Sequence, residues 1–379
     1  MFFGRKKEKE LLKSVESGNH VRQRKELFWK RFRKNRAAVW SLRILWVLVF
    51  IAVFGPFLAN EKPIYCKLNG ESYFPIFKSM AVDLGFSDWQ PVFKTTPWKD
   101  HKFESVVRTP IPFSGQSFDL KAGNYKSPFE KTDSESRHWL GTAELGRDVL
   151  AGMIEGTRTA LLVGLIAMAI AAFIGIILGS IAGYFGDSGL KMSRGRVYLN
   201  LIGLFFGIFY GFLTRTLAFS EGHFGIEFLK SIGIFIVILT LFNLLAHLLK
   251  FIPFFAKQVT VPADLIIMRI IEIINAIPGL LLLLTAVALI KQPSVFYVMA
   301  IIGLLAWTGI ARFIRAELLR IRNLSYIESA RAMGFPEFKI LIKHAIPNAL
   351  GPVLITVAFG IAAAILTESV LSFLNIGTS

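Results

Sequence analysis

The sequence is poor in the residues that covalent cross-links and metal sites require. Only one of its 379 residues, Cys66, is a cysteine, so the chain cannot form an internal disulfide bond. Its six histidines are scattered, and none has the spacing of a zinc or haem ligand set. Acidic residues are also few, 26 against 43 Lys and Arg, which gives a formal net charge of +17. These shortages exclude a disulfide framework and argue against a metal centre.

Catalytic motifs are missing as well. The sequence contains no G-x-x-x-x-G-K-[ST] loop for nucleotide phosphates and no nucleophile elbow. An enzyme embedded in the membrane would need a reactive cluster of side chains within its apolar segments, and none is evident. We therefore expect a chain that is not an enzyme, and any ATP that drives it must be hydrolysed elsewhere.

Long apolar segments dominate what is present. Hydrophobic residues make up 54% of the chain, above the 45–50% of a soluble domain, and they occur in blocks long enough to cross a bilayer. The pattern predicts an all-α integral membrane protein, a polytopic bundle of helices. We predict seven spans, at residues 38–59, 157–184, 197–218, 231–252, 265–290, 295–316 and 349–373.

The distribution of charge predicts the orientation of these spans. Residues 1–36 hold 13 Lys and Arg against four Glu, so we expect the arm 1–37 in the cytoplasm. The first apolar block follows this arm and is too long for a signal peptide, which predicts a retained anchor. The polar, proline-containing stretch 60–155 then becomes an extracytoplasmic domain, and the short basic loops fall inside. Because the cations flank apolar blocks, we interpret them as membrane contacts and expect no nucleic acid partner.

The polar interruption at 317–347 predicts a short pair of helices outside the bilayer. Ser325 is suited to cap a helix over 325–333, and Gly334 to follow it with a positive φ. Pro336 then opens a second helix that Pro347 ends. A partner that grips such a helix pair could move the spans on either side as rigid bodies. The alternative is a plain cytoplasmic hairpin with basic ends.

This loop resembles the Glu-Ala-Ala…Gly…Ile-Leu-Pro signature of binding-protein-dependent ABC permeases. Glu328, Ala330, Gly334 and Pro347 stand at the matching positions, while Ser329 and Ile346 replace the commoner Ala and Leu. Other segments are similar to the dipeptide/oligopeptide/nickel branch of that family, and to its subgroup for peptide and microcin uptake. They are Ala59–Pro63, Tyr73–Pro75, Leu140–Leu150, Met268–Pro278 and Leu371–Gly377, with departures at Ala143 and Asn375.

The resemblance implies a type I ABC importer permease in the bacterial inner (cytoplasmic) membrane. Such a subunit forms the translocation pathway for peptides or peptide-like solutes, although nickel or another small solute would fit the same resemblance. The implied partners are a second homologous permease, two ABC ATPase subunits or domains, an extracytoplasmic solute-binding protein and the lipid membrane. ATP and Mg would bind the ATPase subunits, and this chain would bind no cofactor or metal.

Three groups of candidate site residues follow from the resemblance and from the positions of polar residues. The residues that would couple the chain to the ATPase are Tyr326, Glu328, Ser329, Ala330, Arg331, Ala332, Gly334, Pro336 and Pro347. Polar or helix-bending residues inside spans could serve the pathway or a gate, or else form interhelical hydrogen bonds beside a kink: Glu272, Asn275, Pro278 and Glu368. Docking of a binding protein could use Glu144, Arg147 and Asp148, which could equally be a solvated helix cap.

Two features depart from the family. Residues 187–262 add two spans without a counterpart, and the family continues beyond the Leu371–Gly377 stretch to a further span. We therefore expect a truncated chain or a curtailed gene product. A transporter driven by an ion gradient remains the alternative function, and it would require charges near the bilayer midplane and inverted repeats.

Overall fold

The computed structural model of the chain describes residues 29–30, 32–68, 70–83, 103–130, 136–221, 224–288 and 295–374, together with Trp89, Phe93, Trp98 and His101. Contacts divide it into two compact units. The first comprises Met1–Phe77 and Pro91–Arg158, and the second Lys78–Gln90 and Thr159–Ser379. Most of the predicted basic arm and the last residues of the Leu371–Gly377 stretch lie outside the described residues.

The first unit contains one apolar helix and a small sheet. Helix α2 (Arg36–Leu58) begins where the Asn35 side chain accepts a hydrogen bond from the Ala38 amide at 3.2 Å. Strand β1 (Tyr65–Leu68) pairs antiparallel with both β2 (Glu71–Tyr73) and β3 (Ser105–Val107). Helix α3 (Pro75–Asp83) follows the sheet.

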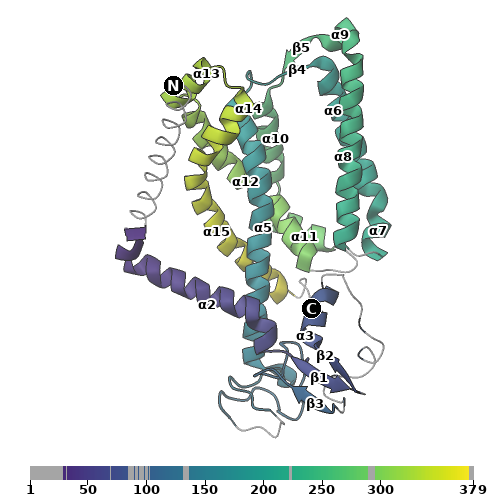
Figure 1. The fold of residues 1–379 in the computed structure, drawn as a ribbon, viewed down its shortest axis with the longest axis vertical. Helices are drawn as coiled ribbons and strands as arrows, with labels where there is room; N and C mark the ends of the chain where they lie inside the picture. The colour runs from purple at the N-terminus through teal and green to yellow at the C-terminus, as the bar shows by residue number, and fades with distance from the viewer. Residues whose placement is uncertain are drawn as a thin grey trace, which may run out of the picture. The chain divides into compact units, whose positions relative to one another are not determined.

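The second unit is built around three long helices, α5 (Val149–Phe185), α12 (Val295–Ile321) and α15 (Ile346–Phe373) (Figure 1). Small residues let α5 and α12 approach closely, as is typical of membrane helices. A Cβ on Gly179 would lie 2.1 Å from a methyl carbon of Ile314 and 2.4 Å from the Ala311 carbonyl oxygen. These helices therefore pack backbone to backbone and form the apolar centre of the unit.

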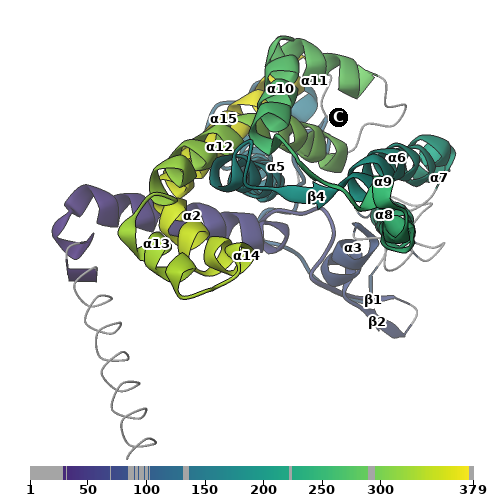
Figure 2. The same ribbon diagram turned by 90° about the horizontal axis from the view of Figure 1, so that it is seen from above.

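A helical hairpin occupies the segment in which the sequence predicts two added spans. Its main helices are α6 (Arg194–Gly211) and α8 (Phe224–Leu248), with the short α7 (Thr216–Glu221) and α9 (Pro253–Ala256). Strands β4 (Lys191–Ser193) and β5 (Gln258–Thr260) pair antiparallel at its ends. Gly207 of α6 packs against the Phe235 ring of α8, where a Cβ would lie 2.8 Å from the ring. Figures 1 and 2 show this hairpin beside the central helices, attached through the β4–β5 ribbon.

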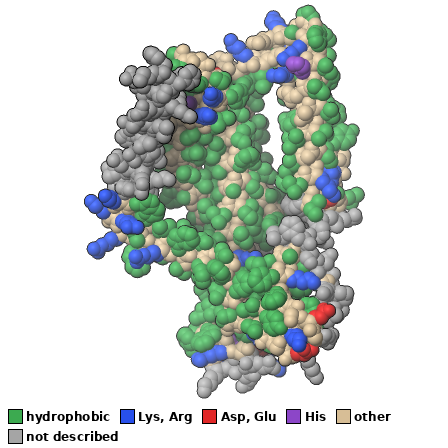
Figure 3. All heavy atoms as spheres, viewed as in Figure 1, with side chains coloured by type: hydrophobic (Ala, Val, Ile, Leu, Met, Phe, Trp, Pro, Cys, Tyr) green, Lys and Arg blue, Asp and Glu red, His purple; other side chains and the backbone are tan. Residues whose placement is uncertain are grey.

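The predicted fold class is confirmed: the chain is mostly helical, and within the described residues six helices are long and apolar enough to cross a membrane. Hydrophobic side chains cover most of the helical surface in the view of Figure 3. The predicted span 265–290 instead contains two helices, α10 (Ala263–Asn275) and α11 (Gly279–Ala288), bent by 76°. Pro278 lies in the break. Proline interrupts a helix because it has no amide hydrogen to donate and its ring clashes with the carbonyl of the preceding turn.

Candidate functional site

The polar interruption between α12 and α15 begins with helix α13 (Ser325–Ala332). The predicted Ser325 cap is wrong, because Leu324 occupies the cap position and no side chain caps the helix. Gly334 has a φ of +79°, as predicted for the residue that follows a helix end. Its amide donates to the Arg331 carbonyl at 2.9 Å, and the Phe335 amide donates to Ala330 at 3.2 Å. This Schellman motif fixes the turn that leads out of α13.

The second helix of this loop is continuous with the last span. Helix α14 (Glu337–Ile340) passes through a π turn (Leu341–Ala345) directly into α15. The prediction that Pro347 ends this helix is wrong. The Ile346 amide bonds to the Leu341 carbonyl, five residues earlier, and Pro347 falls in the first turn of α15, where a missing amide costs little. Residues 337–373 thus form one long helical rod.

Three side chains join the two short helices to α5. Tyr184, near the end of α5, donates its hydroxyl hydrogen to Glu337 at 2.5 Å, and Arg331 donates to the same carboxylate at 3.0 Å. The Arg331 guanidinium also lies 5.6 Å from the centre of the Tyr184 ring. Burial alone would lower the pKa of Arg331, but its bonds to Glu337 and Tyr184 outweigh burial and raise it. We call these residues the Tyr184–Arg331–Glu337 cluster.

The loop has a buried apolar face and an exposed face. Ile327, Ala330 and Ile340 are at most 4% exposed and pack into the core of the second unit. Ala330, expected at the coupling surface, therefore faces inward. The other predicted coupling residues are exposed: Tyr326, Glu328, Ser329, Arg331, Ala332, Gly334, Pro336 and Pro347. Exposed apolar residues accompany them, with Met333 70% and Phe338 57% exposed.

A bidentate ion pair lies between α10 and α12. Arg315 of α12 donates to both carboxylate oxygens of Asp264, at 2.5 and 2.6 Å. Asp187, which follows α5, accepts a hydrogen bond from the Leu265 amide at 2.9 Å. Sequence reasoning missed this pair and two members of the cluster, Tyr184 and Glu337. Their only local signal is position, since Asp264 and Glu337 stand in the first turn of a helix, where carboxylates are favoured.

The predicted pathway residues do not gather at one place. Glu272 pairs with Arg269 one turn away, and its side chain is 56% exposed. Asn275 accepts a hydrogen bond from Thr308 of α12 at 3.2 Å, which is the interhelical role left open from the sequence. Glu368 accepts from Ser372 at 2.7 Å. Among the described hydrogen bonds, none joins Glu368 to Glu272 or Asn275.

An apolar hollow lies between α5, α12 and α15. Its volume is about 180 Å³. Most of the side chains around it are small or apolar: Met168, Ile302, Ala306, Gly309, Ile310, Thr356, Gly360, Ala363, Ala364 and Thr367. None of the four predicted pathway residues lines it.

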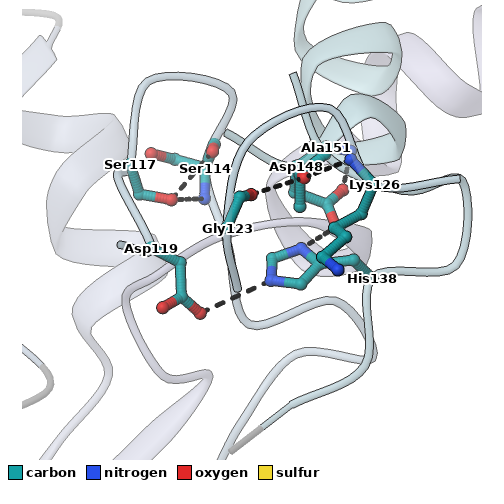
Figure 4. Close-up of polar contacts among 9 residues, drawn as sticks. Ser114, Ser117, Asp119, Gly123, Lys126, His138, Asp148 and Ala151 are labelled. Atoms are coloured by element: carbon teal, nitrogen blue, oxygen red, sulfur yellow. Dashed lines mark hydrogen bonds and ion pairs between the residues drawn. The ribbon is translucent and has the colours of Figure 1, made fainter. Parts of the chain in front are cut away.

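The predicted docking residue Asp148 is not at the surface. It is 2% exposed, and its carboxylate accepts a hydrogen bond from the Ala151 amide at 2.7 Å, which caps the start of α5. Figure 4 shows His138 between Asp148 and Asp119, at 2.8 and 3.4 Å. The fully buried imidazole also stacks on Phe113, with the ring centres 4.2 Å apart. Burial therefore removes Asp148 from any docking surface.

Glu144 and Arg147, the other two residues of that prediction, are exposed. Between them the chain turns sharply through Leu145 and Gly146, with φ values of +58° and +72°. The Arg147 guanidinium lies 4.8 Å from the centre of the Phe118 ring. Both charges can therefore reach a partner at the surface of the first unit.

Comparison with known proteins finds two family matches. Residues 252–379 match the family described as the binding-protein-dependent transport system inner membrane component. Residues 26–73 match the N-terminal transmembrane domain of oligopeptide transport permease C. Both ranges include segments for which the sequence resemblance was noted.

Three curated relatives cover most of the chain. The inner membrane ABC transporter permease protein YejE of Escherichia coli is 27% identical over 353 residues, covering 92% of this chain and 80% of the relative. The peptidoglycan transport system permease protein YejE of Agrobacterium fabrum is 26% identical, covering 92% and 78%. The dipeptide transport system permease protein DppC of Bacillus subtilis is 25% identical, covering 92% and 67%.

Proposed function

We propose that this chain, which matches the binding-protein-dependent transport permeases over residues 26–73 and 252–379, carries peptides or peptide-like solutes as one pore subunit of an ATP-driven importer. It is a transport subunit of the inner membrane with several spans. Relatives named for dipeptide, oligopeptide and peptidoglycan transport support a peptide-like cargo. Nickel and other small solutes are the second choice, because the resemblance extends to permeases of that branch.

The continuous rod of residues 337–373 carries this proposal. A force applied to α14 passes through the π turn into α15 without crossing a flexible joint. The Tyr184–Arg331–Glu337 cluster passes the same force to α5, because Glu337 is hydrogen-bonded to Tyr184. A motor protein that grips α13 and α14 would thus move several spans together.

The assembly that this mechanism needs contains further chains. Two ABC ATPase subunits or domains would hold ATP and Mg and would grip the exposed face of α13 and α14 from the cytoplasm. A second homologous permease would complete the pore. An extracytoplasmic solute-binding protein would deliver the cargo, and Glu144 and Arg147 are the charges that we propose for its docking. The N-terminus then lies in the cytoplasm.

The test is a charge reversal on the exposed face of α13. In the complete importer in proteoliposomes, Glu328→Arg should lower solute-stimulated ATP hydrolysis at least tenfold, because a cation would face the ATPase groove where a carboxylate stood. The matched control is Glu61→Arg, which reverses an equally exposed carboxylate in the first unit. Unchanged stimulation in Glu328→Arg would contradict the coupling role.

A second measurement distinguishes the ATP-driven importer from a transporter driven by an ion gradient. Uptake should continue when ionophores collapse the proton and sodium gradients, provided that ATP is supplied on the cytoplasmic side. Uptake that stops with the gradients while ATP is present would favour a secondary transporter.

A further inference from the structure

Lys and Arg side chains that have no carboxylate partner among the described residues lie together at one end of the α6–α8 hairpin. We call this end the hairpin base; it consists of β4, β5, α9, the first turn of α6 and the turn that follows α8. The sequence has no Asp or Glu from 188 to 220 or from 228 to 263. Five Lys and Arg of these segments lie in the hairpin base: Lys191, Arg194, Arg196, Lys250 and Lys257. In Figure 3 blue side chains cluster where α9 lies.

These five cations differ from several other Lys and Arg of the second unit, which have carboxylate partners. At the far end of the hairpin, Arg215 and Lys230 both pair with Glu227. In the central helices, Arg315 pairs with Asp264 and Arg320 pairs with Glu317. None of the five base cations has an ion pair among the described residues. The base therefore presents concentrated positive charge that the described part of the chain does not neutralise.

Exposed aromatic residues accompany this charge. Phe251 is 90% exposed and Phe254 57% exposed, and Lys250 and Lys257 flank them in the sequence. The guanidinium of Arg194 lies 5.4 Å from the centre of the Phe254 ring. Aromatic side chains beside Lys and Arg are typical of segments that lie in the interface between lipid headgroups and acyl chains.

The base also holds two donor groups without acceptors. The Nε of Arg196 and the hydroxyl of Ser193 are buried atoms with no hydrogen-bond partner among the described residues. Buried donors are normally satisfied, and a phosphate oxygen is a strong acceptor for both groups. An occupant that carries a phosphate would satisfy these atoms and the charge together.

The base lies at the same end of the second unit as the coupling helices. The Val261 amide donates to the Leu190 carbonyl at 2.9 Å, next to the turn where Asp187 binds the Leu265 amide. Phe185, which ends α5, packs on Phe338 of α14 with the ring centres 5.1 Å apart. If α14 meets an ATPase, as proposed above, the base meets the cytoplasmic leaflet, whose surface carries anionic lipids.

We propose that the hairpin base binds the phosphate headgroup of an anionic glycerophospholipid in the cytoplasmic leaflet. The exposed lysines attract the headgroup, Arg196 and Ser193 bond its phosphate, and Phe251 enters the lipid interface. The choice of leaflet rests on the proposed function, whereas the lipid preference itself does not. The site is independent of the transported solute.

The test uses native mass spectrometry to measure lipid binding to the full-length chain in detergent. Phosphatidylglycerol should bind in preference to phosphatidylcholine, and 0.5 M salt should weaken that preference because charge attraction is screened. Lys250→Gln/Lys257→Gln should lower the affinity for phosphatidylglycerol roughly 30-fold, since each lysine near an anionic surface contributes about fivefold. Arg196→Gln should lower it as well.

The matched control is Arg108→Gln/Lys121→Gln, which removes two exposed cations from the first unit and should leave the preference intact. Soluble glycerol 1-phosphate should not displace the lipid, because it lacks the acyl chains that Phe251 contacts. No preference in the unaltered chain, an equal loss in both double variants, or displacement by glycerol 1-phosphate would each overturn the proposal. ATPase coupling is not measured here, so failure of this site and failure of the proposed function can be told apart.

Discussion

Glu337 receives hydrogen bonds from two different helices, and one of the two donors is far from it in sequence. Tyr184 precedes it by 153 residues, and Arg331 lies on the preceding short helix. No local sequence pattern indicates that Tyr184 and Glu337 are in contact. The sequence therefore identified Arg331 through its motif and missed the other two residues. Asp148 is the opposite case, because its position before an apolar helix suggests the helix cap that the sequence left open, and its carboxylate accepts the Ala151 amide hydrogen bond.

The cluster predicts that coupling depends on the Tyr184 hydroxyl. Tyr184→Phe keeps the ring beside Arg331 but removes the hydrogen bond to Glu337, worth about 1 kcal/mol because the carboxylate is partly exposed. We expect several-fold fewer solute molecules transported per ATP hydrolysed, measured in proteoliposomes. Tyr198→Phe, on the hairpin helix α6, is the control. Equal transport ratios in the two variants would contradict the role given to the cluster.

Cys66 allows a residue-scale test of the first unit through pH. Burial raises the pKa of its thiol, and the side chain is fully buried on β1, the strand that pairs with both β2 and β3. A raised pKa leaves less thiolate at any given pH, so alkylation should stay slow in the folded chain when the pH rises from 7 to 8.5. Ser72→Cys in a Cys66→Ala chain places the thiol on the exposed part of β2 and should react at once. Fast alkylation of native Cys66 would show that the small sheet does not shield it.

At the scale of elements, apolar length predicts most of the helices, while helix ends and breaks depend on contacts. Six predicted spans correspond to single helices, because a run of about 20 apolar residues has few other stable states in a membrane. The 76° break at Pro278 and the continuation through Pro347 could not be read in the same way. Both residues are prolines, and the local sequence does not say whether a proline bends a helix or begins one. The π turn decides the second case.

Gly334 offers a prediction at this scale. Its φ of +79° suits glycine, and a Cβ there would meet no atom within 4 Å, so substitution strains only the backbone. Gly334→Asn should retain most coupled ATP hydrolysis, because asparagine tolerates a left-handed conformation. Gly334→Val should cost about 1–2 kcal/mol in the turn and should reduce coupling strongly. Membrane insertion, measured by protease accessibility, should be the same in both variants. Two variants with equal activity would show that the turn is not rigid.

At the scale of the whole molecule, the sequence predicted a membrane permease and located two extra spans without explaining how they attach. The attachment is the β4–β5 ribbon, where the chain leaves and rejoins the central helices through paired strands. Its strands are three residues long, too short to give a strand pattern, which is why they could not be predicted.

The ribbon predicts that the hairpin can be removed without unfolding the rest of the second unit. Leu190 and Val261 are joined by a 2.9 Å backbone hydrogen bond, so a short Gly-Ser linker can close a deletion of residues 191–260. The deleted segment contains two spans, so the orientation of later spans should be unchanged. Protease protection of α12 to α15 in membrane vesicles tests this. The deletion variant should also lose the preference for anionic lipid, and a scrambled topology would show that the hairpin is needed for insertion.

Because Leu190 and Val261 lie close together, this position is also suited to the insertion of another domain. A foreign domain whose own termini lie side by side, such as a small fluorescent reporter, could be grafted there without stretching either flanking helix. The fluorescence of such a chimera would report how much of the chain reaches the membrane, with the coupling helices left in their native sequence.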